Sequence, residues 1–317
     1  AAAVVVGGGF IGLEMVENLI ERGVKVTLLE KLDQVLPPLD PDMAAIVHAR
    51  LKDSGVQLLL GQGLAAVGDA DGRLGIITDQ GSEIVCDMLI LSVGIRPENG
   101  LAKAAGLNLC PRGHIKVDAA MRTSDPDIYA VGDAVCTHDV VLGIPTATAL
   151  AGPANKQARV AADNVMGRSS IFSGTQGTAV VKFFDLTAAS TGASEKSLAE
   201  HRVPYLVSYT HSASHASYYP GARPTAIKLL FAPGDGKILG AQTVGYEGVD
   251  KRIDVLAAAL RNGLNVADLE QLELAYAPPY SSAKDPVNVA GYVANNILKG
   301  DMEIVTWRDI DSLPADH

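Results

Sequence analysis

The first residues of this sequence whose types and spacing suggest chemistry form a glycine-rich turn near the amino end. Residues 3–6 are apolar, as in a parallel strand buried on both faces, and Gly7-Gly8-Gly9-Phe10-Ile11-Gly12 follows directly. In a GxGxxG turn, the first glycine permits the bend, the second lets the backbone approach a pyrophosphate, and the third lets the helix pack on the sheet. These positions are Gly7, Gly9 and Gly12. The pattern predicts a dinucleotide at the start of a helix over residues 10–22.

An acidic residue closes the next predicted strand. Glu30 follows the predicted strand 24–29, at about the 20-residue spacing at which a carboxylate accepts a hydrogen bond from a ribose 2′-hydroxyl. Glu30 therefore favours NADH, because it would repel the 2′-phosphate of NADPH. Lys31 follows immediately and weakens this preference, since a cation could meet that phosphate. The simpler alternative is a glycine-rich strand–helix turn that binds nothing.

Composition excludes several other classes of protein. The 317 residues are 48% hydrophobic, with a formal net charge of −10 and no cluster of basic residues, which argues against binding to nucleic acid. We find no apolar run long enough for a membrane span and no secretion signal, so we expect a cytoplasmic protein. Cys86, Cys110 and Cys136 are far apart. We expect neither a disulfide framework nor a metal site, and each cysteine to be a small buried hydrophobe.

The elements that must position these residues fall into successive groups. An α/β unit ends near residue 97 and includes a helix over 43–54 capped by Asp42. A strand ending at Val131 and an alanine-rich helix over 147–166 come next. From Thr178 onward, antiparallel strands are followed by helices near 248–262 and 286–299, as in an α+β domain.

Three further motifs resemble the flavin-dependent pyridine nucleotide–disulfide oxidoreductases. The stretch TSDPDIYAVGDA, residues 123–134, resembles this family's second FAD motif, in which an aspartate holds the ribityl chain. The resemblance assigns this role to Asp133, with Gly132 allowing close approach of the backbone. In SVGIRPEN, residues 92–99, Gly94 would leave room for the nicotinamide. The helix that opens at Ala149-Leu150-Ala151 would point its N-terminus at the flavin and stabilise negative charge there.

The same resemblance assigns roles to one acid and two tyrosines. Glu14 matches a position near flavin and nicotinamide, where the family pairs it with a lysine; a solvated acid early in a helix is the alternative. Residues 275–288, AYAPPYSSAKDPVN, resemble the dimerisation-domain signature of coenzyme A-disulfide reductases, persulfide reductases and NADH oxidases. The resemblance implies that Tyr276 and Tyr280 enter the partner subunit's active site and serve a leaving thiolate, although purely structural tyrosines remain an alternative.

Two neighbouring features are less specific. Residues 217–221, SYYPG, fall where this family has another loop near the substrate. His211 and His215 have the i,i+4 spacing of a helical metal site, but the surrounding serines, glycine and proline do not indicate a helix. We therefore expect no metal there.

The resemblance predicts an α/β fold, with a Rossmann-like NAD(P)-binding domain and a partial FAD-binding domain followed by an α+β dimerisation domain. The expected ranges are 1–97, 98–172 and 173–300, with a linker over 301–317 that resembles one leading to a rhodanese-like domain. The family's chains are longer at the front, where they hold the ADP half of the FAD site and the redox cysteine. We therefore expect a protein truncated at its N-terminus.

The function implied by the resemblance is hydride transfer from NAD(P)H through FAD to a disulfide or persulfide of the coenzyme A class, in a homodimer. One alternative is an NADH oxidase that reduces oxygen or peroxide. Another, of a different class, is a nucleotide-binding and dimerisation fragment without catalysis. No residue visible in the sequence separates these three functions.

Overall fold

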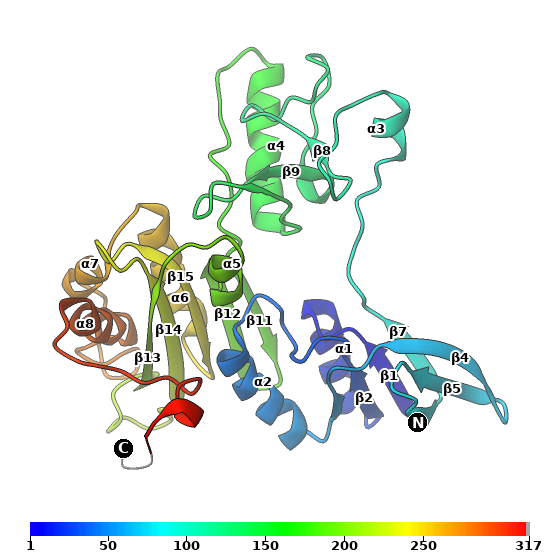
Figure 1. Cartoon of the computed structure of the whole chain (residues 1–317), viewed down its shortest axis with the longest axis horizontal. Coiled ribbons are helices and arrows are strands. Elements are labelled where there is room, and N and C mark those ends of the chain that lie inside the picture. Colours follow the sequence, from blue (N-terminus) through cyan, green and yellow to red (C-terminus); the bar gives the residue numbers. More distant parts are fainter. Residues whose placement is uncertain (315–317) are drawn as a thin grey trace.

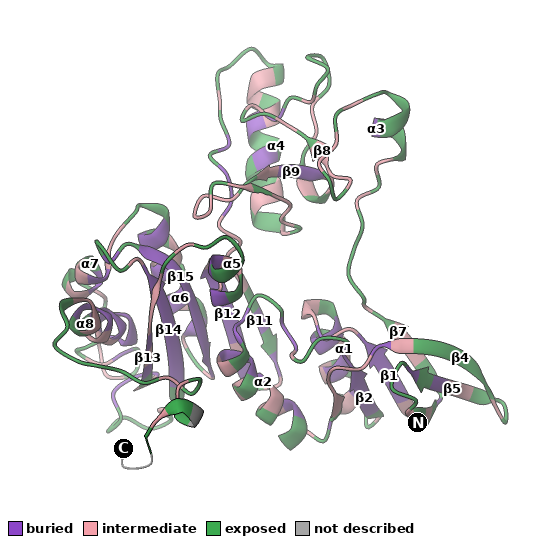
Figure 2. Cartoon of the chain, viewed as in Figure 1, coloured by how far each residue is buried: buried purple, intermediate pink, exposed green. Residues whose placement is uncertain are grey.

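The computed structural model describes residues 1–314, which form a broad body and a smaller lobe above it (Figure 1). The body contains a parallel sheet in the first part of the chain and an antiparallel sheet in the last part. Figure 2 shows that buried residues are concentrated in the body, whereas the lobe is mostly exposed or half-buried. The last three residues of the expected linker, 315–317, lie outside the described residues.

The parallel sheet has the order β3-β2-β1-β7. Its strands are β1 (Ala2–Val6), β2 (Lys25–Leu29), β3 (Gln57–Leu59) and β7 (Met88–Leu91). Helix α1 (Phe10–Glu21) connects β1 to β2, and α2 (Pro41–Asp53) connects β2 to β3. A separate antiparallel sheet, β4-β5-β6, lies between β3 and β7 in the chain and consists of β4 (Leu64–Ala70), β5 (Arg73–Thr78) and β6 (Glu83–Cys86). The βαβ arrangement confirms the Rossmann-like expectation.

Helix α2 begins earlier than its sequence indicates. Asp40 is the N-cap residue in place of Asp42, and Pro41 occupies the first helical position. A proline is suited to that position because its missing N–H would have no partner inside the helix.

The lobe contains short elements around one long helix. These are α3 (Gly100–Ala104), β8 (Ile115–Lys116), the 3₁₀ turn η1 (Gly132–Ala134), β9 (Val135–His138), β10 (Pro145–Thr146) and α4 (Ala151–Val165). The strand expected to end at Val131 does not form, since Tyr129 makes only an isolated bridge with Arg122. Helix α4 starts at Ala151 and not at Ala147, because residues 145–146 pair with β9 and Leu150 is extended.

The second half of the body is a five-stranded antiparallel sheet of order β11-β12-β15-β14-β13. Its strands are β11 (Ala179–Phe183), β12 (Leu186–Gly192), β13 (Leu206–Ala213), β14 (Pro224–Phe231) and β15 (Ile238–Gly245). The helices of this part are α5 (Glu195–Glu200), α6 (Val249–Arg261), α7 (Val266–Gln271) and α8 (Pro286–Lys299), and the 3₁₀ turn η2 (Ile310–Ser312) follows. Strands followed by helices confirm the predicted α+β character.

Both faces of this sheet are covered. Along β14, Ile227, Leu229 and Phe231 pack on one face with residues of α6, α7 and α8. Ala226 lies on the other face and packs with residues of α1 and α2. Because successive side chains of a strand point to opposite faces, β14 contributes to a separate hydrophobic core on each face of the sheet.

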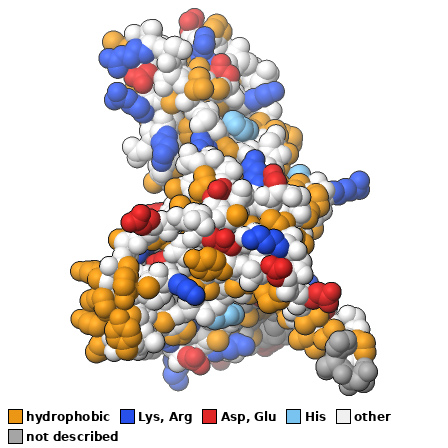
Figure 3. Space-filling view, turned by 90° about the vertical axis from the view of Figure 1, so that its left-hand side faces the viewer, with side chains coloured by type: hydrophobic (Ala, Val, Ile, Leu, Met, Phe, Trp, Pro, Cys, Tyr) orange, Lys and Arg blue, Asp and Glu red, His pale blue; other side chains and the backbone are white. Residues whose placement is uncertain are grey.

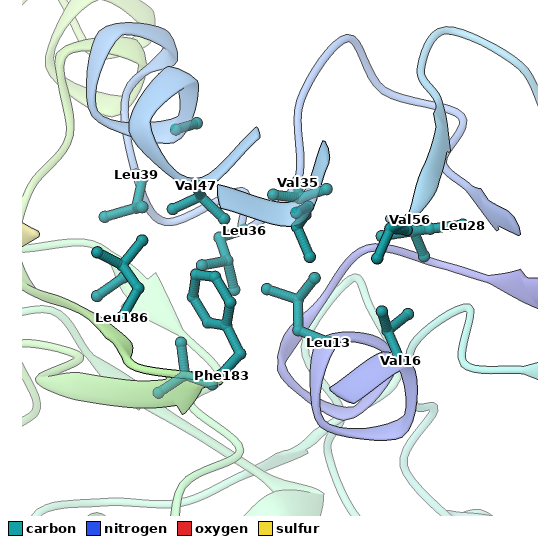
Figure 4. Close-up of a cluster of buried hydrophobic side chains, with 14 of the residues drawn as sticks. Leu13, Val16, Leu28, Val35, Leu36, Leu39, Val47, Val56, Phe183 and Leu186 are labelled. Atoms are coloured by element: carbon teal, nitrogen blue, oxygen red, sulfur yellow. The ribbon is translucent and has the colours of Figure 1, made fainter. Parts of the chain in front are cut away.

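One hydrophobic cluster joins the antiparallel sheet to the parallel one. Figure 4 shows Phe183 and Leu186 from the antiparallel sheet beside Leu13 and Val16 of α1 and Val47 of α2. Phe183, Leu186, Leu13, Val16 and Val47 are all fully buried. Each buried side chain of this size contributes about 1.5–3 kcal/mol by leaving water. The two sheets are therefore held together as one body.

The cysteines differ from the sequence-based expectation. Cys110 and Cys136 form a disulfide with a Cα–Cα distance of 6.5 Å, whereas Cys86 is free and buried. The chain turns back after Cys110, with a bridge between Leu109 and Ile115, and β8 then pairs in parallel with β9. This long-range pairing places Cys110 beside Cys136. The prediction that all three cysteines are unpaired was wrong because it used only their separation along the chain.

Among the described residues, the structure has no helix that is both long enough and apolar enough to cross a membrane.

Candidate functional site

The glycine turn has the geometry that its sequence predicts. Gly7 has a φ of +105°, and a Cβ there would lie 2.3 Å from the backbone oxygen of Ser92. A Cβ on Gly12 would lie 1.9 Å from the carbonyl oxygen of Gly7, whereas a Cβ on Gly9 would meet nothing within 4 Å. Helix α1 has no side-chain cap and no acidic residue in its first turn. The first N–H groups of α1, starting at Phe10 and Ile11, are therefore available to an anion such as a phosphate.

Glu30 stabilises this turn through hydrogen bonds to its backbone. Its side chain is buried, and its two carboxylate oxygens accept hydrogen bonds from the backbone N–H of Gly8 at 2.6 Å and of Leu32 at 2.8 Å. Sequence reasoning assigned Glu30 to a ribose and did not anticipate these two bonds. Lys31, by contrast, is exposed. The carboxylate is thus used to hold the turn, and the exposed charge beside it is positive.

The end of β7 lies against the glycine turn. The Ser92 hydroxyl, Oγ, lies 2.9 Å from the backbone oxygen of Val6 and 3.0 Å from that of Gly7, so it donates to this pair of acceptors. Two residues further on, Gly94 has a φ of +96° and open space around it. Its neighbours Val93 and Ile95 are 72% and 62% exposed. The segment that lies beside the glycine turn, residues 93–95, therefore presents an exposed apolar surface.

The lobe presents a second helix N-terminus without a cap. Gly132 in η1 has a φ of +80°, and its N–H donates to Oε1 of Gln157 in α4 at 2.7 Å. Asp133 beside it is exposed. Helix α4 starts after Ala149 and Leu150, and it has no capping side chain and no acid in its first turn. Sequence reasoning missed Gln157, a buried amide that ties the Gly132–Asp133 turn to α4.

Glu14 lies on the exposed side of α1, one turn after the glycines. No lysine or arginine among residues 1–314 lies within ion-pair distance of it. The resemblance places the lysine that pairs with this glutamate in the N-terminal half of the family's chains, outside this sequence.

The tyrosine motif forms a cluster with a second loop. The hydroxyl oxygens of Tyr276 and Tyr218 lie 3.1 Å apart, and this hydrogen bond raises the pKa of Tyr276. Tyr280 is 73% exposed. Behind these loops is a cavity of about 460 Å³, and its lining includes His215, Lys251 and Tyr276. Figure 3 looks onto the side of the body that holds the antiparallel sheet and shows hydrophobic side chains gathered at one edge.

A buried ion pair holds the two tyrosine loops together. Arg252 of α6 is 1% exposed and donates to Asp285 at 3.0 Å and to the backbone oxygen of Ser214 at 2.8 Å. Asp285 also accepts from the Ser281 hydroxyl at 2.6 Å. Burial raises the pKa of Asp285, but Ser281, the backbone N–H of Val287 and Arg252 outweigh it and hold the pKa below its ordinary value. Sequence reasoning missed Arg252, because nothing in a helix sequence marks which arginine is buried.

The two histidines of the i,i+4 pair do not lie on one helix. His211 is exposed in β13, whereas His215 is buried after the strand, with its Nε2 3.2 Å from the backbone oxygen of Pro220. The absence of a helix there agrees with the expectation from the sequence.

A second buried ionic cluster anchors the segment that follows Glu30. Lys228 of β14 is fully buried, and its Nζ lies 3.0 Å from Asp40, 2.8 Å from Asp42 and in contact with Glu195. Arg308 also pairs with Glu195. The three acids have metal-ligand geometry, but the Lys228 ammonium lies against them. The cluster joins the start of α2 to the antiparallel sheet.

The glycine turn, the Gly132–Asp133 turn and the tyrosine loops lie on three different parts of the molecule (Figure 1). Comparisons with known proteins identify the family to which the chain belongs. Residues 1–161 match the model of the family described as pyridine nucleotide-disulphide oxidoreductase, and residues 178–286 match the dimerisation domain of the same family. The chain therefore belongs to the pyridine nucleotide-disulphide oxidoreductases, a family that uses FAD and NAD(P)H.

Three proteins are similar to this chain over nearly its whole length. The chain is 35% identical over 291 residues to a coenzyme A disulfide reductase of Staphylococcus aureus, covering 92% of this chain and 65% of that protein. It superposes with a TM-score of 0.95 on reduced CoADR-RHD of Bacillus anthracis, at 52% identity, covering 98% of this chain and 56% of that one. An NAD-dependent persulfide reductase from A. fulgidus gives a TM-score of 0.95 at 39% identity, with coverage of 98% and 58%. The chain thus spans about two thirds or less of these relatives' lengths.

Proposed function

We propose that this chain is the nicotinamide-nucleotide-binding and dimerisation part of a flavin-dependent reductase that acts on disulfides or persulfides of the coenzyme A class. The observation that carries the proposal is the glycine turn, in which Gly7 and Gly12 are sterically required and Gly9 opens onto an uncapped helix. The proposed ranges are 1–97 for the NAD(P)-binding domain, 98–172 for part of the FAD-binding domain and 173–300 for the dimerisation domain. We further propose a cytoplasmic homodimer.

The residues present fit a nicotinamide nucleotide. The free N–H groups of α1 would receive the pyrophosphate, and Gly94 with its apolar neighbours would adjoin the nicotinamide ring. Glu30 would accept a ribose hydroxyl through lone pairs that its two backbone bonds leave over, which favours NADH. Lys31 is the residue that would meet a 2′-phosphate.

The lobe fits part of a flavin. Asp133 is exposed and would accept hydrogen bonds from the ribityl hydroxyls, while Gln157 holds the turn in place. The uncapped N-terminus of α4 would stabilise negative charge on the flavin ring. Together, bound NADH and FAD would supply the hydride chemistry, for which the chain provides binding and orientation.

The tyrosine pair suits a thiol leaving group. The phenol of Tyr276 has an ordinary pKa of 10.0 and is therefore protonated at neutral pH, and its hydrogen bond with Tyr218 raises this pKa further. We propose that, across the dimer interface, Tyr276 or Tyr280 donates a proton to the thiolate sulfur released from the substrate. An oxidase that reduces oxygen releases no thiolate from its substrate. The redox thiol that reduces the substrate would lie in the whole protein outside these residues, since Cys86 is buried and Cys110 and Cys136 are joined in a disulfide away from the tyrosine loops.

The test uses the whole protein. The expected result is a flavin absorbance spectrum that NADH bleaches and that coenzyme A disulfide or coenzyme A persulfide restores without oxygen. Recovery by oxygen alone would instead identify an oxidase. A colourless protein that binds NADH and dimerises would identify a non-catalytic module, and would overturn the proposal.

A further inference from the structure

The disulfide between Cys110 and Cys136 lies beside the turn that presents Asp133. Cys136 is in β9, three residues after Asp133. Strand β9 pairs with two neighbouring strands, and each pairing involves only two residues. The paired residues are Ile115 and Lys116 in β8, and Pro145 and Thr146 in β10. The covalent bond is thus the strongest connection between this strand and the loop before β8.

The two sulfurs differ in access. Cys136 is 5% exposed, whereas Cys110 is half-buried. Cys110 lies in a turn in which its carbonyl oxygen accepts a hydrogen bond from the N–H of Gly113 at 2.8 Å. Arg112, two residues after Cys110 in the chain, is exposed, whereas Lys116 is the strand partner of Cys136. Neighbouring cations stabilise thiolates and attract anionic thiols. An incoming thiolate would therefore reach Cys110 more readily than Cys136.

We propose that Cys110 and Cys136 form a reversible redox site, which small anionic thiols open and the corresponding disulfides close. A thiolate attacks Sγ of Cys110, the bond between the two sulfurs breaks, and Cys136 leaves as a thiolate that takes up a proton. A second thiolate then attacks the sulfur of the first thiol, the mixed disulfide bond breaks, and Cys110 leaves as a thiolate that takes up a proton. In sum, the protein disulfide gains two electrons and two protons, and two thiols become one disulfide.

Opening the bond would loosen the flavin-facing turn. Without it, the Gly132–Asp133 turn would keep its bond to Gln157 and the short pairings of β9, but the loop over residues 107–114 would lose its covalent attachment. The choice of coenzyme A as the thiol rests on the proposed function, whereas the exchange reaction itself does not. The exchange reaction and the proposed function can therefore be disproved independently of each other.

The experiment uses the 317-residue chain, equilibrated with graded ratios of coenzyme A to coenzyme A disulfide and, in parallel, of reduced to oxidised glutathione. Peptide mapping under acid quench should show the linked Cys110–Cys136 peptide decline as thiol rises and return as disulfide rises. Cys86, which is free and buried, serves as the internal control and should stay unmodified. A linked peptide that neither thiol opens, or no linked peptide at all, would overturn the proposal.

Hydrogen exchange then measures the effect on the turn. Amides of residues 107–116 and 132–138 should exchange about fivefold to tenfold faster once the bond is open, because local opening then lacks the covalent restraint. A Cys110→Ala/Cys136→Ala variant should show the fast rate with and without thiol, and Cys86→Ala should behave like the wild type. Equal exchange rates in the open and closed protein would contradict the structural consequence. Opening by glutathione but not by coenzyme A would overturn the choice of thiol, whereas absence of NADH binding would count only against the proposed function.

Discussion

The hydroxyl groups of Tyr218 and Tyr276 lie 3.1 Å apart, although 58 residues separate them in the chain. Tyr218 belongs to the loop after β13, and Tyr276 to the segment before α8. The two loops meet because Arg252 and Asp285 hold them from beneath. A motif that resembles a substrate loop only weakly in sequence is thus in direct contact with the stronger tyrosine motif.

We predict that Tyr276→Phe lowers kcat of disulfide reduction in the whole protein by about 10²-fold, the lower range for loss of a general acid, with a smaller change in KM. Tyr218→Phe should bring the pKa of Tyr276 down toward its ordinary value of 10.0, because the hydrogen bond that raises it is lost. NMR of ¹³C-labelled tyrosine measures this pKa. Tyr292→Phe, in α8, is the control and should change neither quantity. Unchanged turnover in Tyr276→Phe would leave the tyrosine with a structural role.

The glycine turn allows a matched pair of substitutions. Gly12→Ala would place a Cβ 1.9 Å from the carbonyl oxygen of Gly7, so we expect a loss of both stability and NADH binding. Gly9→Ala meets no protein atom within 4 Å, and Gly9 has a φ of −79° that any residue adopts. We therefore expect an unchanged Tm with NADH binding weakened by about tenfold, or about 1.4 kcal/mol, because the methyl group occupies the path of the pyrophosphate.

Calorimetric titration with NADH and a thermal melt test this pair. Gly68→Ala in β4 also has open space around it and is the control for a harmless glycine substitution. If Gly9→Ala binds NADH as the wild type does, the pyrophosphate does not lie over this glycine.

Arg252 should be important for stability. Among the described residues, Arg252→Met leaves the buried carboxylate of Asp285 with only the more distant ammonium of Lys251, at 3.6 Å, and removing one partner of a buried ion pair costs about 3–5 kcal/mol. Urea denaturation of the chain measures the loss. The control is Arg122→Met, which breaks an exposed pair with Asp118 and should cost less than about 1 kcal/mol. A similar loss in both variants would mean that Arg252 is not the anchor of the tyrosine loops.

The Lys228 cluster predicts a specific dependence of stability on pH. Burial raises the pKa values of Asp42 and Glu195, but Lys228 outweighs it and holds both below their ordinary 3.8 and 4.5. Burial lowers the pKa of Lys228, but the surrounding acids outweigh it and hold it above 10.5. The acids contribute stability above their ordinary pKa values and lose it as the pH falls through the lowered ones. Lysine contributes stability below 10.5 and loses it as the pH rises through its raised value.

Urea midpoints measured across the pH range should therefore show a contribution from the cluster that is constant between about pH 5 and pH 10 and falls on both sides. Lys228→Met should lower the stability by about 3–5 kcal/mol at neutral pH, because Arg308, which pairs with Glu195, is then the only cation among residues 1–314 left beside the three acids. Lys182→Met, an exposed residue in β11, should leave the curve unchanged. A Lys228→Met protein that keeps the alkaline decline would show that another group causes it.

Much of the candidate site could be predicted from local patterns. The strand, the glycine spacing and the helix that follows form one contiguous unit, so their geometry depends on neighbouring residues and on backbone conformations that only glycine adopts readily. The bounds of α8, 286–299, were also predictable, since Asp285 and Pro286 mark its start and Gly300 its end. Predictions failed where the structure departed from local preference, as at Val131, where too little pairing was available for a strand.

By itself, then, the sequence determined the glycine turn, the order of the folding units and the motifs that indicate the family. Only the tertiary structure decided which side chains meet across the chain. Cys110 joins Cys136, Tyr218 contacts Tyr276, and Lys228 is buried among acids from two parts of the body. The physical reason is range: turns and helix ends follow from residues a few positions apart, whereas these contacts depend on how whole sheets and loops pack, which no short pattern specifies.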